Sequence, residues 1–136
     1  MAKGSDTREL ISTLRGFDTF SGCDKGDIEA LVEAGAPFSL PSGWPLVQEG
    51  IPADAVYVLT EGQARVFHQR EQIADIGVGD LVGEMALLKG GQRSATVTSA
   101  SRVAGLRVEY DKLKPVLQKR PKLASAFDAV YSAHQG

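Results

Sequence analysis

One segment of the chain, residues 79–97, combines glycines, small side chains and charges in a way that the rest of the sequence does not. Within it, residues 84–88 are good helix formers, but Gly90 and Gly91 leave room for only about one helical turn. The start of a helix presents unpaired N–H groups and a partial positive charge. Gly83, just before this turn, lets a ligand approach the backbone closely. The pattern predicts an anion site.

The charged and polar residues of the segment indicate which kind of anion it binds. Arg93 supplies a planar, permanently charged fork that suits phosphate oxygens. Ser94 adds a hydroxyl, and the small Ala95 leaves its backbone N–H accessible. Glu84 would repel a phosphate, so it needs a different partner, and ribose hydroxyls are suitable donors. An acid for a sugar beside a cation for a phosphate predicts a nucleotide.

Residues 1–36 are predicted to form helices. Apolar residues recur at helical spacing in two runs, and Gly35 followed by Pro37 ends the second run. Asp24 or Asp27 is the expected cap of that second helix. Two aromatic residues in the link, Phe17 and Phe20, are expected to pack into the core.

Residues 37–108 are predicted to form an antiparallel β-barrel or jelly roll. Short runs rich in β-branched and aromatic residues alternate with glycines, which is typical of such folds rather than of a βαβ sheet. Glu61 and Gly62 are expected to form a tight turn between two strands. The expected strands are residues 44–47, 55–60, 64–67, 72–76, 96–100 and 103–108.

Residues 109–136 are predicted to return to helix. Asp111 is the expected cap of a first helix, with Pro115 near its first turn, and Arg120-Pro121 should break it. A second helix then carries an apolar stripe that includes Phe127 and Tyr131. We expect a single domain over residues 1–136, mainly β with flanking helices.

Composition limits the other function classes. With 15 basic and 17 acidic residues the net charge is -2, which gives no electrostatic case for a nucleic-acid or membrane partner. One cysteine and two distant histidines predict neither a disulfide framework nor a metal site. No run of apolar residues is long enough to span a membrane, so we expect a cytoplasmic domain, free or as part of a larger protein. Lys89 lacks the surrounding pattern of an NTP-binding loop.

The segment resembles the phosphate-binding cassette of the cyclic nucleotide-binding domain family. The matching residues are Gly79-Asp80, Gly83 through Leu88 including Met85, and Arg93 through Val97, with a nine-residue step from Glu84 to Arg93. Turn glycines at positions 43, 50 and 62 and the order of helices, strands and helices match the family as well. Val78 and Val82 depart from the family's common residues, a proline and an aromatic side chain, and the second departure implies a looser pocket.

The resemblance implies a role for each cassette residue. Glu84 would accept a hydrogen bond from the ribose 2′-hydroxyl, and Arg93 would pair with the cyclic phosphate. The backbone N–H groups of Ala86 and Ala95 and the Ser94 hydroxyl would complete the phosphate site. Apolar residues would line the base and sugar; these are Val66, Val82 and Val97. The aromatic residues of the last helix, Tyr131 and Phe127, have the spacing of core residues, but the resemblance also allows one of them to cap the base, and Tyr131 is the candidate.

The implied function is a regulatory domain that senses a 3′,5′-cyclic nucleotide, without catalytic residues or a cofactor. Binding would move the two C-terminal helices, and an attached or interacting effector would respond. The resemblance favours cAMP, although Ser94 occupies a position where a hydroxyl can also favour cGMP. A degenerate domain that serves as a non-binding scaffold is the alternative from another class. An enzyme, either a phosphodiesterase or a jelly-roll oxygenase, is disfavoured because the His/Asp clusters that these enzymes use are missing from the sequence.

Overall fold

The computed structural model describes residues 3–50, 54–83 and 95–135, with the backbone alone at residues 3–6 and 131–135. The chain begins with helix α1 (Lys3–Arg15), the 3-10 helix η1 (Asp18–Phe20) and helix α2 (Lys25–Ala34). Both linking aromatic residues pack as expected, since Phe20 is buried and Phe17 lies against the same cluster.

Helix α2 begins with a reciprocal cap formed by both candidate residues. The Asp27 N–H donates to Asp24 Oδ1 and the Asp24 N–H donates to Asp27 Oδ2, each at 3.0 Å. Two helix-terminal donors are satisfied in this way, so the cap needs both carboxylates. The helix ends at Gly35, where a Cβ would lie 2.7 Å from the Arg107 carbonyl oxygen. Glycine at this position therefore lets the chain turn closely past the sheet.

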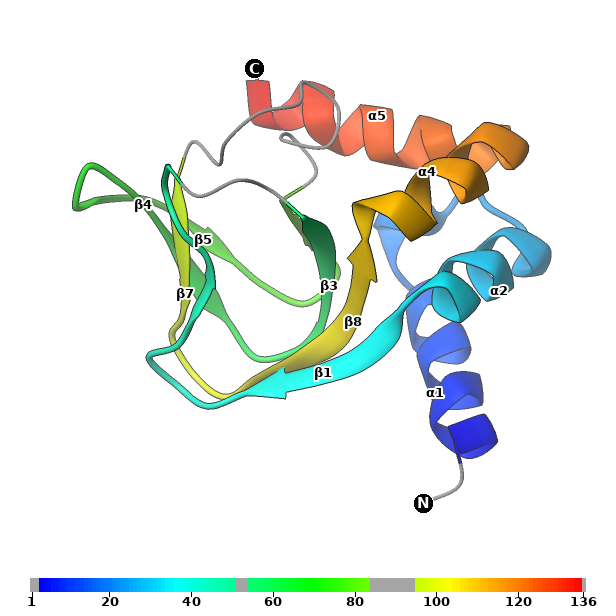
Figure 1. Ribbon diagram of the computed structural model, residues 1–136, viewed down its shortest axis with the longest axis horizontal. Helices are drawn as coiled ribbons and strands as arrows, with labels where there is room; N and C mark the ends of the chain where they lie inside the picture. The colour runs from blue at the N-terminus through cyan, green and yellow to red at the C-terminus, as the bar shows by residue number, and fades with distance from the viewer. Residues whose placement is uncertain (1–2, 51–53, 84–94, 136) are drawn as a thin grey trace.

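The middle of the chain forms two four-stranded antiparallel sheets, in the orders β1-β8-β3-β6 and β2-β7-β4-β5. The expected antiparallel β-fold is thus confirmed, as an open jelly roll rather than a closed barrel (Figure 1). All the expected strands are present, with ends that differ by one residue at most. The strands are β1 (Ala36–Leu40), β2 (Pro45–Val47), β3 (Ala55–Glu61), β4 (Ala64–His68), β5 (Glu71–Ile76), β6 (Leu81–Val82), β7 (Thr96–Ser99) and β8 (Val103–Glu109).

Strands β1 and β6 were not predicted, and they occupy the two ends of the first sheet. Gly62 forms the expected turn after β3 with a φ of +85°, and a Cβ there would meet the Arg102 carbonyl oxygen. Glycine is therefore required at this turn for both its backbone conformation and its lack of a side chain.

The C-terminal helices are α4 (Tyr110–Lys119) and α5 (Pro121–Gln135). Arg120 separates them with φ −125° and ψ 83°, which confirms the break before Pro121. The predictions for the start of α4 were wrong in two respects. The helix begins one residue before Asp111, after Glu109, and has no side-chain cap; Pro115 therefore lies inside the helix, beyond its first turn.

Two hydrophobic clusters organise the described part of the fold. In the helical cluster, the helices cover one face of the β1-β8-β3-β6 sheet, and the other face of this sheet looks toward the second sheet (Figure 1). The inter-sheet cluster fills the space between the two sheets, and its buried members are Leu46, Val47, Leu59, Ala64, Val82, Val97 and Val103. Phe127 is 1% exposed within the helical cluster, so it packs in the core and does not cap a ligand site. The buried members of the helical cluster are Leu14, Phe20, Ile28, Leu31, Val32, Val56, Val58, Leu81, Leu106, Val108, Leu113, Leu123 and Phe127.

Candidate nucleotide site

The cassette begins with a tight turn at residues 77–80. The Asp80 side chain accepts from the Gly77 N–H at 2.9 Å, while the Asp80 N–H donates to the Gly77 carbonyl at 3.1 Å. The Gly79 N–H donates to the Leu59 carbonyl at 2.9 Å, which ties the turn to β3. Gly79 has a φ of +93°, a conformation that favours glycine. The Gly79-Asp80 pair thus fixes the direction in which the chain enters β6.

Strand β6 ends at Gly83, which also has a positive φ, +94°. The strand pairs with β3 through Leu81 and Val82, opposite Val58 and Tyr57. The carbonyl of Gly83 accepts a hydrogen bond from the Tyr110 hydroxyl at 2.6 Å. The first residue of α4 is therefore joined directly to the residue that precedes Glu84.

The apolar residues expected to line the base and sugar come together in the structure. Val66 on β4 lies opposite Val97 on β7, and both belong with Val82 to the inter-sheet cluster. Val82 and Val97 are 2% and 5% exposed, whereas Val66 is only half-buried. Among these three, Val66 has the most side-chain surface left to offer a ligand.

The polar residues of the predicted site lie outside the described residues. These are Glu84, Met85, Ala86, Arg93 and Ser94, together with the predicted helical turn at 84–88. The side chain of Tyr131 is also outside the description, although its backbone lies in α5. The structure describes the two ends of the segment, at Gly83 and at the half-buried Ala95. The ligand contacts of these residues remain predictions.

Two contacts of the cassette were missed by the sequence analysis. The Thr19 hydroxyl donates to the Gly79 carbonyl at 2.8 Å, and a Cβ on Gly79 would lie 3.5 Å from the Phe17 ring. The η1 region therefore packs on the entry of the cassette. The Tyr110–Gly83 bond is the second contact. Both join residues far apart in sequence, and the only local signal was the presence of an aromatic residue where β8 passes into α4.

The β3 and β8 strands beside the cassette carry an aromatic and charged cluster. Arg107 lies over the Tyr57 ring, 5.9 Å from its centroid, and its Nε donates to the Tyr57 hydroxyl at 3.3 Å. This hydrogen bond raises the pKa of Arg107. Phe38 meets the same ring edge-on at 5.2 Å. Because Tyr57 pairs with Val82, these contacts hold the strand that β6 lies against.

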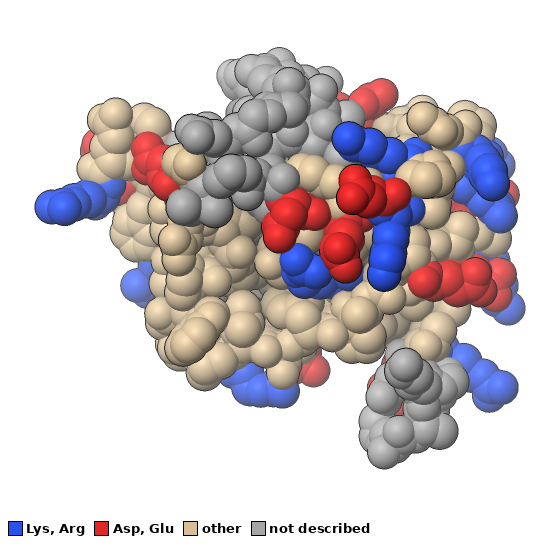
Figure 2. All heavy atoms as spheres, viewed as in Figure 1, with Lys and Arg blue, Asp and Glu red and all other residues tan. Residues whose placement is uncertain are grey.

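Charges of both signs cover the junction of β8 and α4, in the central part of the face shown in Figure 2. Arg107 contacts Asp54 at 3.4 Å and Glu109 at 4.0 Å, and Lys112 contacts Glu109 at 3.9 Å. These pairs are exposed or half-exposed, so each contributes little to stability. The junction thus carries nearly balanced charge.

The described residues contain neither a metal-binding cluster nor a helix that could span a membrane. Within residues 3–50, 54–83 and 95–135, no group of three or more His, Cys, Asp or Glu side chains is placed to hold a metal ion. None of the described helices is long and apolar enough to cross a membrane.

The fold is an antiparallel jelly roll with helices at both ends and with positive-φ glycines where the chain passes from one sheet to the other. The family model described as the cyclic nucleotide-binding domain matches residues 37–120. The chain belongs to this family. This match confirms, at the level of the family, the resemblance inferred from the cassette. A cyclic nucleotide-binding domain is a regulatory module rather than a catalytic one.

Individual relatives show the same domain in different proteins. Over 110 residues the chain is 26% identical to the CRP-like cAMP-activated global transcriptional regulator of Mycobacterium tuberculosis, covering 77% of this chain and 49% of that protein. It is 30% identical over 115 residues to the acetyltransferase Pat of Mycolicibacterium smegmatis, covering 82% of this chain and 34% of that protein. The chain thus spans half or less of the length of these relatives.

A solved structure supports the fold independently of sequence. The regulatory domain of Toxoplasma gondii PKA, crystallised with cAMP, superposes with a TM-score of 0.85 over 97% of this chain and 51% of that one. The sequence identity is 19%, so this similarity establishes the fold and leaves the ligand to be argued separately.

Proposed function

We propose that this domain binds a 3′,5′-cyclic nucleotide in the segment between β6 and β7, with cAMP favoured over cGMP. The observation that carries the proposal is the nine-residue step from Glu84 to Arg93, in a segment that begins at the positive-φ Gly83 and ends beside β7. Glu84 binds the ribose 2′-hydroxyl and Arg93 neutralises the phosphate. The Ala86 and Ala95 N–H groups and the Ser94 hydroxyl complete the phosphate contacts.

Three valines of the inter-sheet cluster would contact the apolar part of the nucleotide. Val82 and Val97 lie near the two ends of the cassette, and Val66 lies opposite Val97. The half-buried Val66 offers surface to the base and sugar, while the two buried valines hold the ends of the cassette together. Removing apolar ligand surface from water favours binding, and the cost of association offsets part of this gain. Tyr131 covers the base from α5.

Calorimetric titration with cAMP and cGMP tests the ligand assignment. Arg93→Ala is expected to lower the affinity by several kcal/mol, because the phosphate loses its charged partner. Arg102→Ala is the matched control, since Arg102 pairs with Glu61 at the β7–β8 turn, away from the cassette. Unchanged affinity in Arg93→Ala would contradict the assignment. No heat with either nucleotide, on protein freed of co-purified ligand, would favour the scaffold alternative.

The same titration decides the base. Ser94 follows the cassette arginine, where a hydroxyl suits either nucleotide, so the preference for cAMP rests on the Arg-Ser-Ala variant of the motif. A tenfold preference for cGMP, about 1.4 kcal/mol, would reverse the assignment.

The signal is proposed to pass to the C-terminal helices. The Tyr110–Gly83 hydrogen bond supports this step, because it joins the first residue of α4 to the start of the cassette. A ligand changes the helices only as far as it binds their two arrangements with different affinity. Hydrogen exchange of α4 and α5 is expected to slow when nucleotide binds. Identical exchange with and without bound nucleotide would contradict this step.

The output is proposed to lie in an effector, attached or interacting, in the cytoplasm. The relatives above support an attached effector, since a transcriptional regulator and an acetyltransferase each contain much more chain than this domain.

A further inference from the structure

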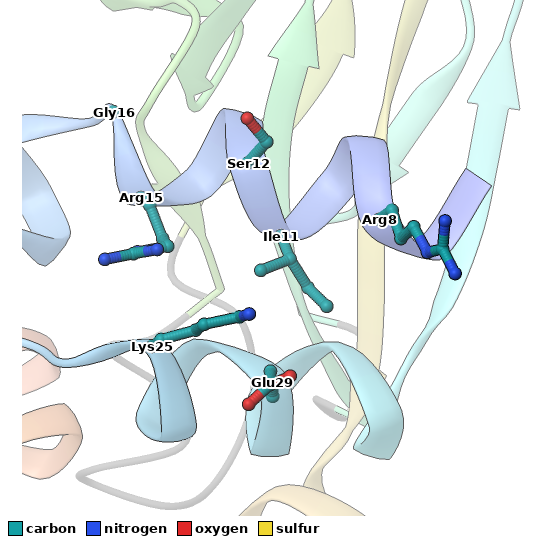
Figure 3. A pocket seen from close by; sticks show the side chains of 7 residues that line it. All are labelled: Arg8, Ile11, Ser12, Arg15, Gly16, Lys25 and Glu29. Atoms are coloured by element: carbon teal, nitrogen blue, oxygen red, sulfur yellow. The ribbon is translucent and has the colours of Figure 1, made fainter. Parts of the chain in front are cut away.

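A groove of about 620 Å³ runs between α1 and α2 (Figure 3). One stripe of α1, at positions 8, 11, 12 and 15, forms one wall, and Lys25 and Glu29 of α2 form the other. The groove lies on the helical side of the molecule, away from the β6 and β7 strands that frame the cassette (Figure 1). It is therefore a separate feature from the nucleotide site.

The groove carries three basic side chains and one acidic side chain, Glu29. Arg8, Arg15 and Lys25 are exposed, and none of them belongs to an ion pair among the described residues. Figure 3 shows Arg15 and Lys25 at the same end of the groove, on facing helices. In this view their charged ends extend in opposite directions, the Lys25 ammonium toward the middle of the groove and the Arg15 guanidinium away from it.

The acids nearest in sequence do not balance this end. Asp24 contacts Lys122 at 3.7 Å and Asp27 contacts Arg120 at 3.6 Å, so both are directed to the region of α5. Lys25 is also the first residue of α2, where the helix dipole disfavours a cation. Both acids are thus paired elsewhere, and the helix dipole adds positive potential at Lys25. A carboxylate from outside the chain would therefore be attracted to this end of the groove.

The shape of the groove favours an extended acidic peptide over a small anion. Arg8 and Arg15 are seven residues apart on α1, or roughly 10 Å along the axis at about 1.5 Å per residue. An extended chain rises about 3.3 Å per residue and every second side chain faces the same way, so two acidic side chains four residues apart, about 13 Å, can both turn toward the groove and reach its two ends. Between them lies the half-buried Ile11, which suits an apolar side chain.

A peptide also fits better than a nucleic acid. Glu29 lies in the groove and would repel a phosphate backbone, whereas a peptide can present a lysine, an amide or its own N–H groups there. The chain as a whole carries a net charge of -2, which disfavours a polyanion beyond the groove. We propose that the α1–α2 groove docks an acidic segment of a partner protein, with carboxylates at Arg15 and Lys25 and at Arg8.

The test uses the 136-residue chain and a fluorescein-labelled peptide with two glutamates four residues apart and a leucine midway between them. Anisotropy titrations are run at low and at physiological salt. The double variant Arg15→Glu/Lys25→Glu is expected to weaken binding by at least about tenfold. Arg65→Glu/Lys114→Glu makes the same change in net charge at exposed positions on β4 and α4 and should bind as the unmodified chain does.

Circular dichroism checks that each variant is folded. If the charge reversal prevents folding, Arg15→Gln/Lys25→Gln replaces it and should weaken binding by about threefold to tenfold. Equal loss in the control variant would overturn the proposal, because the attraction would then depend on net charge alone. It would also be overturned if the peptide with glutamines in place of glutamates bound as tightly, if the glutamate peptide failed to bind at millimolar concentration, or if a single-stranded oligonucleotide bound more tightly.

Discussion

The two hydrophobic clusters differ in the size of their side chains and in how much surface the adjoining sheet residues leave exposed. The helical cluster is built from large side chains such as Phe20, Leu31 and Phe127, all at or below 1% exposure. The inter-sheet cluster is built from smaller residues, mostly Val, Leu and Ala, and residues such as Val66, Tyr57 and Ile76 at its boundary are only partly buried. Partly buried residues also pack around the helical cluster, but the residues through which the β1-β8-β3-β6 sheet faces the helices are at most 1% exposed; these are Val56, Val58, Leu106 and Val108. The space between the sheets instead includes side chains with surface left for a ligand.

This difference indicates a division of roles across one sheet. Neighbouring residues of β3 serve opposite sides, with Val56 and Val58 in the helical cluster and Tyr57 and Leu59 with the inter-sheet cluster. We expect substitutions on the helical side to change mainly the free energy of unfolding. Substitutions between the sheets should change mainly the affinity for nucleotide. Substitutions on each side of the sheet test this division.

Phe127→Ala is expected to lower the free energy of unfolding by about 3–5 kcal/mol, because it leaves a cavity in the helical cluster. Urea denaturation monitored by circular dichroism measures this change. The folded fraction of the variant should still bind nucleotide with an affinity close to that of the unmodified chain. A loss of affinity with little change in stability would show that Phe127 serves the ligand, contrary to its burial.

Val58→Ala and Val66→Ala form a matched pair from opposite sides of the division. Val58 is fully buried in the helical cluster, so its truncation should cost about 2 kcal/mol of stability and leave nucleotide affinity unchanged. Val66 is half-buried, so its truncation should cost less than about 1 kcal/mol of stability and weaken nucleotide binding severalfold. Urea denaturation and calorimetric titration of both variants measure the two quantities. The same ratio of stability loss to affinity loss in both would break the division.

Tyr110→Phe tests the contact between the two sides. The change removes the hydroxyl that donates to the Gly83 carbonyl and should cost about 1 kcal/mol of stability. It should also reduce the effect of nucleotide on hydrogen exchange in α4, since the helix loses its hydrogen bond to the cassette. Tyr57→Phe is the control, because it removes the bond to Arg107 without touching Gly83. Equal effects of the two variants on exchange in α4 would count against a specific role of Tyr110.

Asp24→Asn gives the smallest effect and concerns the helical side alone. The hydrogen bond from the Asp27 backbone, with help from the nearby Lys122, lowers the pKa of Asp24 below its ordinary value of 3.8. As the pH falls, the unfolded chain therefore takes up this proton before the folded chain does. The stabilisation by Asp24 is present above its ordinary pKa and is lost as the pH falls through the lower folded value.

An asparagine at position 24 can still cap α2 but does not titrate. The stability difference between the unmodified chain and Asp24→Asn should be constant near neutral pH and should shrink as the pH falls below about 3.8. Denaturation midpoints measured across this range test the expectation. A difference that grows on acidification would contradict the sign of the pKa shift.

Local signals were sufficient for most of the fold. Gly43, Gly50 and Gly62 were recognisable as turn residues, and all three have positive φ in the structure. Asp24 and Asp27 were recognisable as alternative caps from their residue type, and the structure uses both in one reciprocal cap. Strand β1 was missed because Pro37 weakens its strand signal, and β6 was missed because two residues give no period to detect. The start of α4 was misplaced because Asp111 has the chemistry of a cap but not its position.

The candidate site was predictable in its chemistry but not in its contacts. Glu84 and Arg93 were found by residue type and spacing within one short segment. Thr19 and Tyr110 touch the cassette across 60 and 27 residues of sequence, to Gly79 and Gly83. Such contacts depend on how the helices pack on the sheet, which no local pattern determines. The groove between α1 and α2 is of the same kind, since its charge is visible in the sequence only after the two helices are paired.

The extent of the helical cluster bears on the smallest fragment of this chain that would remain soluble. Seven of its thirteen buried residues lie before residue 37 or after residue 120, outside the region that the family model matches. A polypeptide restricted to residues 37–120 would keep the pleated layers but uncover Val56, Val58, Leu106 and Val108 on the face that the helices shield. Exposing these four side chains together would create an apolar patch, and such patches promote aggregation. The family's boundary therefore marks what is shared among relatives, whereas the autonomous folding unit of this chain also needs its first and last helices.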